Sequence, residues 1–164
     1  MDFEGASDVY CRAFFDPAQD KFTDTHWRVF DGKCSFNWRL IIPIKSKWSN
    51  YNLTLQAWDR DIISSNELLG EFVVDLGPLL NDVLLTGKQM NMSLEYWQTW
   101  MKDKLIENGY KSADEIKFET REKEEEKFWI PLRRFNSKEG KTIEAGEMQV
   151  TIHLVPLDHV EKFP

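Results

Sequence analysis

Apolar and polar side chains alternate along most of this chain, and this period of two is typical of β-strands. The clearest example is the stretch 36–44, where Phe36, Trp38, Leu40, Ile42 and Ile44 occupy every second position. The same alternation predicts further strands near residues 9–15, 25–30, 53–57, 72–76, 128–132 and 148–154. About seven short strands separated by turn-rich stretches indicate an all-β fold, an antiparallel β-sandwich.

One region follows a different spacing. Between residues 93 and 108 the apolar side chains recur every three or four positions, which predicts a helix with Ser93 as its N-cap and Gly109 as its end. The charged run 114–127 is expected to be a solvated helix end or loop. We therefore expect a helical and charged insertion over residues 88–127, whose apolar stripe packs on the sandwich or contacts a separate partner.

Composition and charge narrow the class of protein. The 164 residues fit a single domain spanning 1–164, and 41% hydrophobic with 13% aromatic residues is a globular composition. The net charge of −7 argues against general nucleic-acid binding, which needs a cationic surface. The longest apolar run, 40–44, is too short to span a bilayer. Cys11 and Cys34 match no metal or disulfide pattern, so a reduced setting is the simpler interpretation, although one bridge in an exported domain stays open.

Two acidic segments carry the candidate chemistry. The segment 58–70 lies between two predicted strands, so it is expected to form a loop at one end of the sandwich. A second acidic segment, 2–8, directly precedes the first predicted strand. Ca2+ takes six to eight oxygen ligands. Clustered carboxylates repel one another, and a bound cation of this kind relieves that repulsion. If both loops share one end of the sandwich, five carboxylates converge there: Asp2, Asp8, Asp59, Asp61 and Glu67.

Apolar residues at the tips of the same loops strengthen this hypothesis. Aspartate alone is weak evidence, because it is common in turns where it bonds its own backbone. Phe3, Ile62 and Ile63, however, are expected at exposed tips. Such residues either pack inside the protein or insert into lipid beside a Ca2+ site.

These segments resemble the C2 domain family. WDRDIISSNELLG, residues 58–70, is similar to its third Ca2+-binding loop, and DFEGASDVY, residues 2–10, is similar to its first. TDTHWRVFDGKCSFNWRLIIPI, residues 23–44, and AGEMQVTIHLVP, residues 145–156, resemble one subgroup, the ferlins. The resemblance leaves the middle insertion uncovered.

The resemblance implies a C2-type β-sandwich that binds Ca2+ and then an anionic phospholipid membrane. By position, Asp2, Asp8, Asp59, Asp61 and Glu67 would be ligands, with Ser64 as a supporting oxygen. Ferlins are large, tail-anchored membrane proteins with many C2 domains, which act in Ca2+-linked vesicle fusion and membrane repair. The chain would be one membrane-associated domain facing the cytoplasm, with other proteins or other C2 domains of the same chain as further partners.

Two departures from the family pattern stand out. Glu67 occupies a position where the family usually has Asp, which would reshape or weaken the site. The strand expected before Asp2 is absent from the sequence, so we expect a fragment whose sandwich has an open edge, and an open edge invites pairing with another chain.

Other functions are less well supported by the residues. No nucleophile–base spacing and no phosphate-binding glycine loop stands out, so an enzyme is not expected. A Ca2+-independent protein-interaction module is the alternative, with Tyr96, Trp97 and Trp100 as its contact. Arg39, Lys45 and Lys47 fit a solvated strand end better than a phosphoinositide site.

Overall fold

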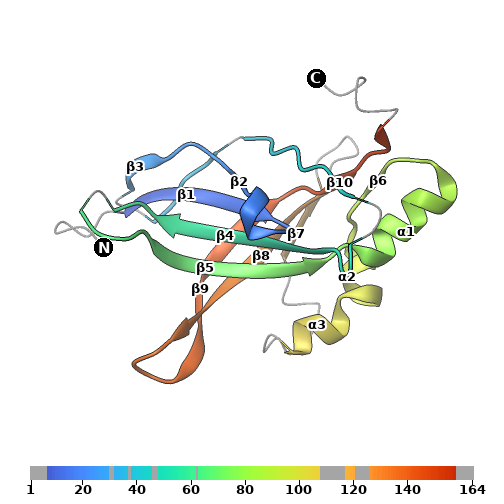
Figure 1. Cartoon of the computed structure of the whole chain (residues 1–164). Coiled ribbons are helices and arrows are strands. Elements are labelled where there is room, and N and C mark those ends of the chain that lie inside the picture. Colours follow the sequence, from blue (N-terminus) through green and yellow to red (C-terminus); the bar gives the residue numbers. More distant parts are fainter. Residues whose placement is uncertain are drawn as a thin grey trace. The chain divides into compact units, whose positions relative to one another are not determined.

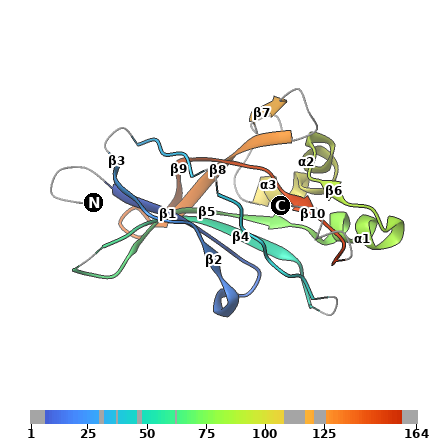
Figure 2. The same ribbon diagram turned by 90° about the horizontal axis from the view of Figure 1, so that it is seen from above.

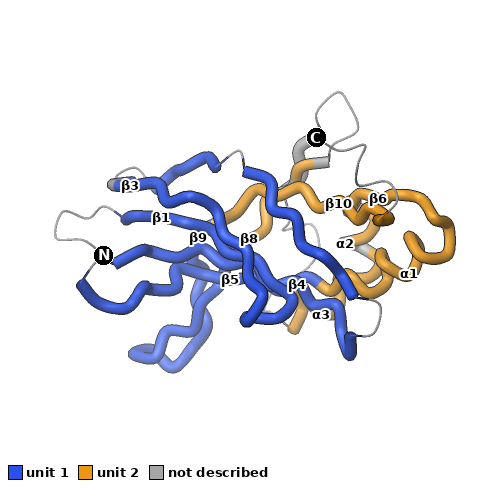
Figure 3. Tube along the Cα trace, turned by 45° about the horizontal axis from the view of Figure 1, so that its top comes forward, with its two compact units in different colours: residues 1–74, 132–146 blue, residues 75–131, 147–164 orange. Residues whose placement is uncertain are grey.

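The computed structural model describes residues 7–29, 32–36, 38–45, 48–61, 63–107, 117–120 and 126–157 (Figure 1). The chain forms two compact units. Unit 1 comprises residues 1–74 and 132–146, and unit 2 comprises residues 75–131 and 147–164 (Figure 3).

Unit 1 is built on an antiparallel sheet in which β1, β4, β5 and β8 are successive neighbours. β1 pairs with β4 so that Val9 lies opposite Asp59 and Ala13 opposite Leu55. β2 and β3 both pair with the other edge of β1, and β9 pairs with β8. Figures 1 and 2 show β1, β4 and β5 side by side. The strands are β1 (Ser7–Phe14), β2 (Lys21–Phe22), β3 (His26–Val29), β4 (Asn52–Asp59), β5 (Glu67–Asp75), β8 (Glu126–Asn136) and β9 (Lys141–Val150).

One face of this sheet is apolar and buried. Ala13 of β1, Leu55 and Ala57 of β4, and Phe72 and Val74 of β5 are all buried. Alternation along each strand explains why these residues share a face, since successive side chains of a strand point to opposite sides. Burying these side chains at about 25 cal/mol per Å² of apolar surface is the main favourable term that holds the strands in register.

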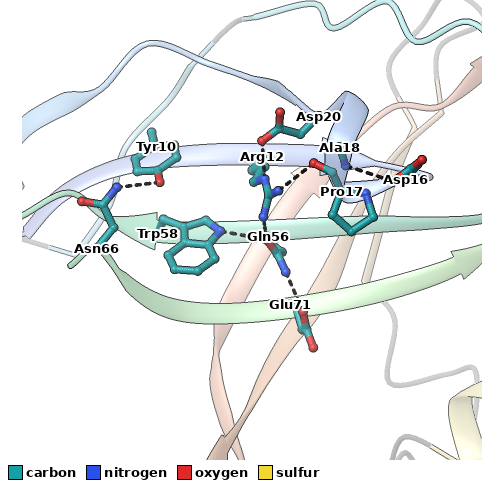
Figure 4. A network of polar contacts seen from close by, with 10 residues as sticks. All are labelled: Tyr10, Arg12, Asp16, Pro17, Ala18, Asp20, Gln56, Trp58, Asn66 and Glu71. Carbon is teal, nitrogen blue, oxygen red and sulfur yellow. Dashed lines mark hydrogen bonds and ion pairs between the residues drawn. The ribbon is translucent and has the colours of Figure 1, made fainter.

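The opposite face of the same strands carries a polar network (Figure 4). Arg12 Nε donates to Asp20 Oδ2 at 2.6 Å, and Arg12 Nη1 donates to Gln56 Oε1 at 3.3 Å. Gln56 Nε2 donates in turn to Glu71 Oε2 at 2.8 Å, and the indole of Trp58 donates to Gln56 Oε1 at 2.8 Å. The network therefore links β1, β4 and β5 through side chains, because a buried amide such as Gln56 is stable only when its polar atoms are paired.

Unit 2 combines short helices with short strands. β6 pairs with β10, and β7 pairs with the first part of β8. Met92, Met101, Leu105 and Ile130 are fully buried. Burial raises the pKa of the Tyr96 phenol, whose hydroxyl donates to the carbonyl of Asp75. The elements are α1 (Gly77–Thr86), β6 (Met90–Asn91), α2 (Leu94–Trp100), α3 (Lys102–Glu107), β7 (Lys117–Thr120) and β10 (His153–Leu154).

The predicted all-β fold is confirmed, and so are five of the expected strands. Residues 9–15, 25–30, 53–57, 72–76 and 128–132 correspond to β1, β3, β4, β5 and β8. The strand with the clearest alternation was predicted wrongly, because the described residues 32–36 and 38–45 form no strand. Their exposure still alternates, with Leu40, Ile42 and Ile44 half-buried. A strand needs a neighbouring backbone as well as an apolar face, and no ladder partner lies along this segment within the described part of the chain.

The other differences concern where elements begin and end. The predicted helix over 93–108 is broken at Met101 into α2 and α3. The expected loop over 114–127 contains β7 and the first residues of β8. The predicted last strand is interrupted, since β9 ends at Val150 and β10 begins at His153.

Helix α1 was not expected, because the pair Gly77-Pro78 reads as the end of a strand. Proline within the first turn of a helix needs no hydrogen bond from its nitrogen, so the same pair can start a helix. Gly87, in the left-handed conformation with φ of 66°, ends α1.

A close approach at Gly70 gives a test of this packing. A Cβ added at Gly70 would lie 2.8 Å from Leu132 Cβ and 2.9 Å from Ala145 Cβ. Gly70→Ala is therefore expected to destabilise the protein by about 1–3 kcal/mol, measured by urea unfolding. The control Lys138→Ala, in the exposed β8–β9 turn, is expected to change stability by less than about 0.5 kcal/mol. Equal stability of Gly70→Ala and wild type would contradict the close packing of β5 on β8 and β9.

Candidate functional site

Two of the predicted ligands meet where β1 begins and β4 ends. The backbone N–H of Asp8 donates to Asp59 Oδ1 at 2.9 Å, and the N–H of Arg60 donates to the carbonyl of Asp8 at 2.8 Å. The pairing of Val9 with Asp59 brings these residues together. Both acids are buried, with 6% of Asp8 and 5% of Asp59 exposed. The expectation that the two acidic segments share one end of the sheet holds for Asp8 and Asp59.

Asp61 lies in the loop between β4 and β5 and shapes that loop through its carboxylate. Its Oδ1 accepts hydrogen bonds from the backbone of Ile63 at 2.9 Å and of Ser64 at 3.2 Å. Its Oδ2 accepts from the Ser64 hydroxyl at 2.5 Å. The Ser64 hydroxyl, followed by the two backbone donors, lowers the pKa of Asp61 to about 2. Asp61 is therefore ionised at neutral pH and is exposed to solvent.

Of the remaining predicted site residues, two are described by the structure and three are not. Glu67 begins β5, is exposed, and has its carboxylate 3.7 Å from the Arg134 guanidinium. Ile63 is almost completely exposed, at 97%. Asp2, Phe3 and Ile62 lie outside the described residues.

The donor set of this loop end consists of oxygen atoms, which suits a hard cation such as Ca2+ rather than a soft one. Within the described ranges, however, no group of three or more His, Cys, Asp or Glu side chains is arranged to hold a metal ion. The structure brings Asp8 and Asp59 together as a pair, while Asp61 binds its own loop. Asp2, the further carboxylate expected from the first loop, is not among the residues described.

Sequence reasoning missed three residues that hold the β4–β5 loop. Asn66 Nδ2 donates to the Tyr10 hydroxyl at 3.1 Å (Figure 4). Asn66 Oδ1 accepts from the backbone N–H of Asp61 at 3.0 Å. The Arg60 guanidinium carbon lies 5.0 Å from the centroid of the Tyr10 ring. The signal in the sequence was an aromatic residue two positions after Asp8 and an amide just before β5.

The two cysteines form no disulfide in the structure. Burial, with a smaller contribution from Cys34, raises the pKa of the Cys11 thiol to about 12. Cys11 is therefore a neutral thiol at physiological pH.

In the helical region, the structure corrects one residue of the aromatic contact expected for a protein-interaction module. Tyr96 is buried, at 5% exposed, so it is not part of an exposed aromatic surface. Trp100 is 57% exposed. The side chain of Trp97 lies outside the description.

In the part of the chain that the structure describes, no helix is both long and apolar enough to cross a membrane.

Comparison with known proteins identifies the class. The family model of the C2 domain matches residues 1–95, more than half of the chain. The chain therefore belongs to the C2 domain family.

Its relatives include ferlins. Myoferlin of Mus musculus is 25% identical over 179 residues, which cover 93% of this chain, and the sperm vesicle fusion protein fer-1 of Caenorhabditis elegans is 30% identical over 95 residues, covering 44%. Ferlin 1 of Toxoplasma gondii is 38% identical over 56 residues, covering 34%. The resemblance to a ferlin C2 domain is confirmed, and the chain spans 8%, 5% and 4% of the length of these three relatives.

The contact between Ser64 and Asp61 gives a prediction about pH. Ser64→Ala removes the largest cause of the lowered pKa, so the pKa of Asp61 is expected to rise from about 2 towards its ordinary value of 3.8. Because the folded pKa lies below the ordinary one, the loop contacts are fully present above the ordinary value and are lost as the pH falls through the lowered one. An NMR titration of the Asp61 side-chain carboxyl carbon measures the shift.

Ser65→Ala is the matched control, since Ser65 is an exposed neighbour that takes no part in the Asp61 contacts. An unchanged pKa in Ser64→Ala would show that this hydroxyl does not stabilise the carboxylate.

Proposed function

We propose that this end of unit 1 binds Ca2+ and thereby docks on an anionic phospholipid membrane. The proposed ligands are the five carboxylates of the two loops, with the Ser64 hydroxyl in support: Asp2, Asp8, Asp59, Asp61, Glu67 and Ser64. The observation that carries this proposal is the junction of Asp8 and Asp59, which unites two acidic segments that are 51 residues apart in the chain. Membership in the C2 family adds to it, because C2 domains commonly bind Ca2+.

Charge explains why a cation would be required. The chain carries a net charge of −7, so by itself it is repelled by an anionic membrane. Ca2+ neutralises carboxylates and adds local positive charge that attracts lipid phosphate. Asp61 is ionised and lies in the exposed loop, so its carboxylate is well placed to bind Ca2+.

The apolar loop tip supplies a second contact with the membrane. Ile63 is 97% exposed, which is unfavourable in water unless the side chain finds an apolar environment elsewhere. We propose that Ile63, with Phe3 and Ile62, inserts between lipid headgroups. Burying one such side chain contributes about 1.5–3 kcal/mol.

The wider role proposed for the chain follows from its relatives. One of them is named as a sperm vesicle fusion protein. We propose that the chain is a single C2 domain, residues 1–164 with an insertion at 88–127, of a ferlin-like, tail-anchored protein in membrane fusion and repair. The domain would face the cytoplasm and act by binding, with no enzymatic activity.

A Ca2+-independent protein-interaction module is the second candidate. Exposed apolar side chains on the helices of unit 2 favour it, because Leu84, Leu85, Trp100 and Ile106 are each more than half exposed. This candidate predicts binding that is the same in Ca2+ and in chelator.

Sedimentation with liposomes separates the two candidates. With phosphatidylserine-containing vesicles, the wild-type chain is expected to sediment in Ca2+ and to stay in solution in chelator. Asp59→Asn/Asp61→Asn keeps the size of both side chains but removes two charges, so binding in Ca2+ is expected to fall at least ten-fold. Absence of wild-type binding, or binding that neither chelator nor the double substitution reduces, would overturn the Ca2+ proposal.

Ile63 separates membrane insertion from cation binding. Ile63→Ser is expected to weaken liposome binding roughly ten-fold, since the buried apolar side chain is lost, while the Ca2+ affinity measured without lipid stays unchanged. Leu157→Ser, at an apolar residue of unit 2 that is 88% exposed, is the control and is expected to bind like wild type. Wild-type liposome binding by Ile63→Ser would remove Ile63 from the membrane contact.

A further inference from the structure

Tyr10 contacts both ends of the β4–β5 loop from outside it. Tyr10 lies on β1 opposite Trp58, one pair away from the pairing of Val9 with Asp59. Its hydroxyl accepts a hydrogen bond from Asn66 at 3.1 Å, at the end of the loop. Its ring lies 5.0 Å from the Arg60 guanidinium, at the start of the loop. Tyr10 itself is only 9% exposed, so its position is fixed by packing.

Arg60 is a cation placed between two candidate ligands. It stands between Asp59 and Asp61 in the sequence, and a guanidinium pairs strongly with a carboxylate that it can reach. Among the described residues, Arg60 makes no ion pair, and its buried Nε has no hydrogen-bond partner. The face of the Tyr10 ring offers the guanidinium an alternative, because an aromatic face attracts a cation.

Asn66 completes the contact with Tyr10 on the other side of the loop. Its amide donates to the Tyr10 hydroxyl and accepts from the backbone N–H of Asp61. The position of Asp61 is therefore tied through Asn66 to a side chain of β1. A loop that is held in place loses less conformational entropy when it binds a ligand.

We propose that Tyr10 is a positioning residue that keeps the Arg60 charge on its ring instead of on Asp59 and Asp61, and thereby preserves the affinity of this loop for a divalent cation. This role rests on the proposed Ca2+ site, where the Arg60 guanidinium would compete with Ca2+ for the loop carboxylates. Without the ring, Arg60 would pair with the loop carboxylates, and Ca2+ would have to displace it.

The proposal is tested by calorimetric titration of the 164-residue chain with CaCl2 in four forms. Tyr10→Leu is expected to lower the Ca2+ affinity roughly three- to ten-fold, which corresponds to the loss of one cation–π contact. Arg60→Gln in the Tyr10→Leu background is expected to restore most of the affinity, because the competing cation is gone. Arg60→Gln alone is expected to bind at least as tightly as wild type.

Rescue by Arg60→Gln distinguishes this role from a structural one, because removing a second side chain does not repair damaged packing. Thermal unfolding without Ca2+ is measured in parallel, and the double variant is expected to be no more stable than Tyr10→Leu. If Tyr10→Leu does not fold, Tyr10→Phe decides: it keeps the ring over Arg60 and loses only the Asn66 contact. The Ca2+ affinity of Tyr10→Phe is then expected to stay within about three-fold of wild type. Adding Arg60→Gln to Tyr10→Phe is expected to change that affinity little.

The outcomes separate this proposal from the proposed function. If wild type binds Ca2+ and Tyr10→Leu binds it equally, or if Arg60→Gln fails to rescue, Tyr10 does not act through Arg60 and the Ca2+ site stands without it. A ten-fold loss in Tyr10→Phe would likewise overturn the role of the ring. If wild type binds no Ca2+, both proposals fall.

Discussion

The antiparallel pairing of β1 with β4 is the constraint on which the candidate site depends. Opposing Val9 to Asp59 places the start of β1 beside the end of β4, and this register lets the Asp8 backbone bond the Asp59 carboxylate. The same register sets the apolar face formed by Ala13, Leu55 and their neighbours, and it aligns the polar network around Gln56 on the other face. A slip by one residue would turn the apolar face to solvent and separate the two acids. Burial of the sheet and assembly of the loop end are therefore consequences of a single pairing.

Local signals in the sequence were sufficient for strands that have one buried apolar face. β1, β4, β5 and β8 were predicted because alternation in each reflects one buried face. The segment 36–44 has the same alternation, but a strand also requires a neighbouring backbone, which residue patterns do not reveal. Helix α1 was missed because Gly77-Pro78 can end a strand or begin a helix, and the packing of Leu79 and Val83 selects the helix. The break at Met101 is of the same kind, since a helical spacing of apolar residues continues through it.

The candidate site was predictable to the extent that strand ends define it. Asp8 and Asp59 could be expected together once both were placed at strand ends, and the structure joins them. The contacts of Asp61 with Ser64 and of Asn66 with Tyr10 could not be foreseen, because they depend on the path of the loop. The place of the Arg60 guanidinium over the Tyr10 ring could not be foreseen either, because it depends on the same loop path. The site therefore combines acids specified by the strands with a loop conformation specified by tertiary contacts.

Ca2+ binding at the end of β1 and β4 is the central claim, and a titration followed by 1H–15N NMR spectra tests it most directly. Addition of CaCl2 is expected to shift the backbone amides of the two loops, above all those of Asp8, Arg60 and Asp61, while amides of unit 2 stay in place. The Asp8 amide is the most informative, because its hydrogen bond to Asp59 Oδ1 reports on the carboxylate itself. Unchanged loop amides at millimolar Ca2+, or shifts confined to unit 2, would contradict the account.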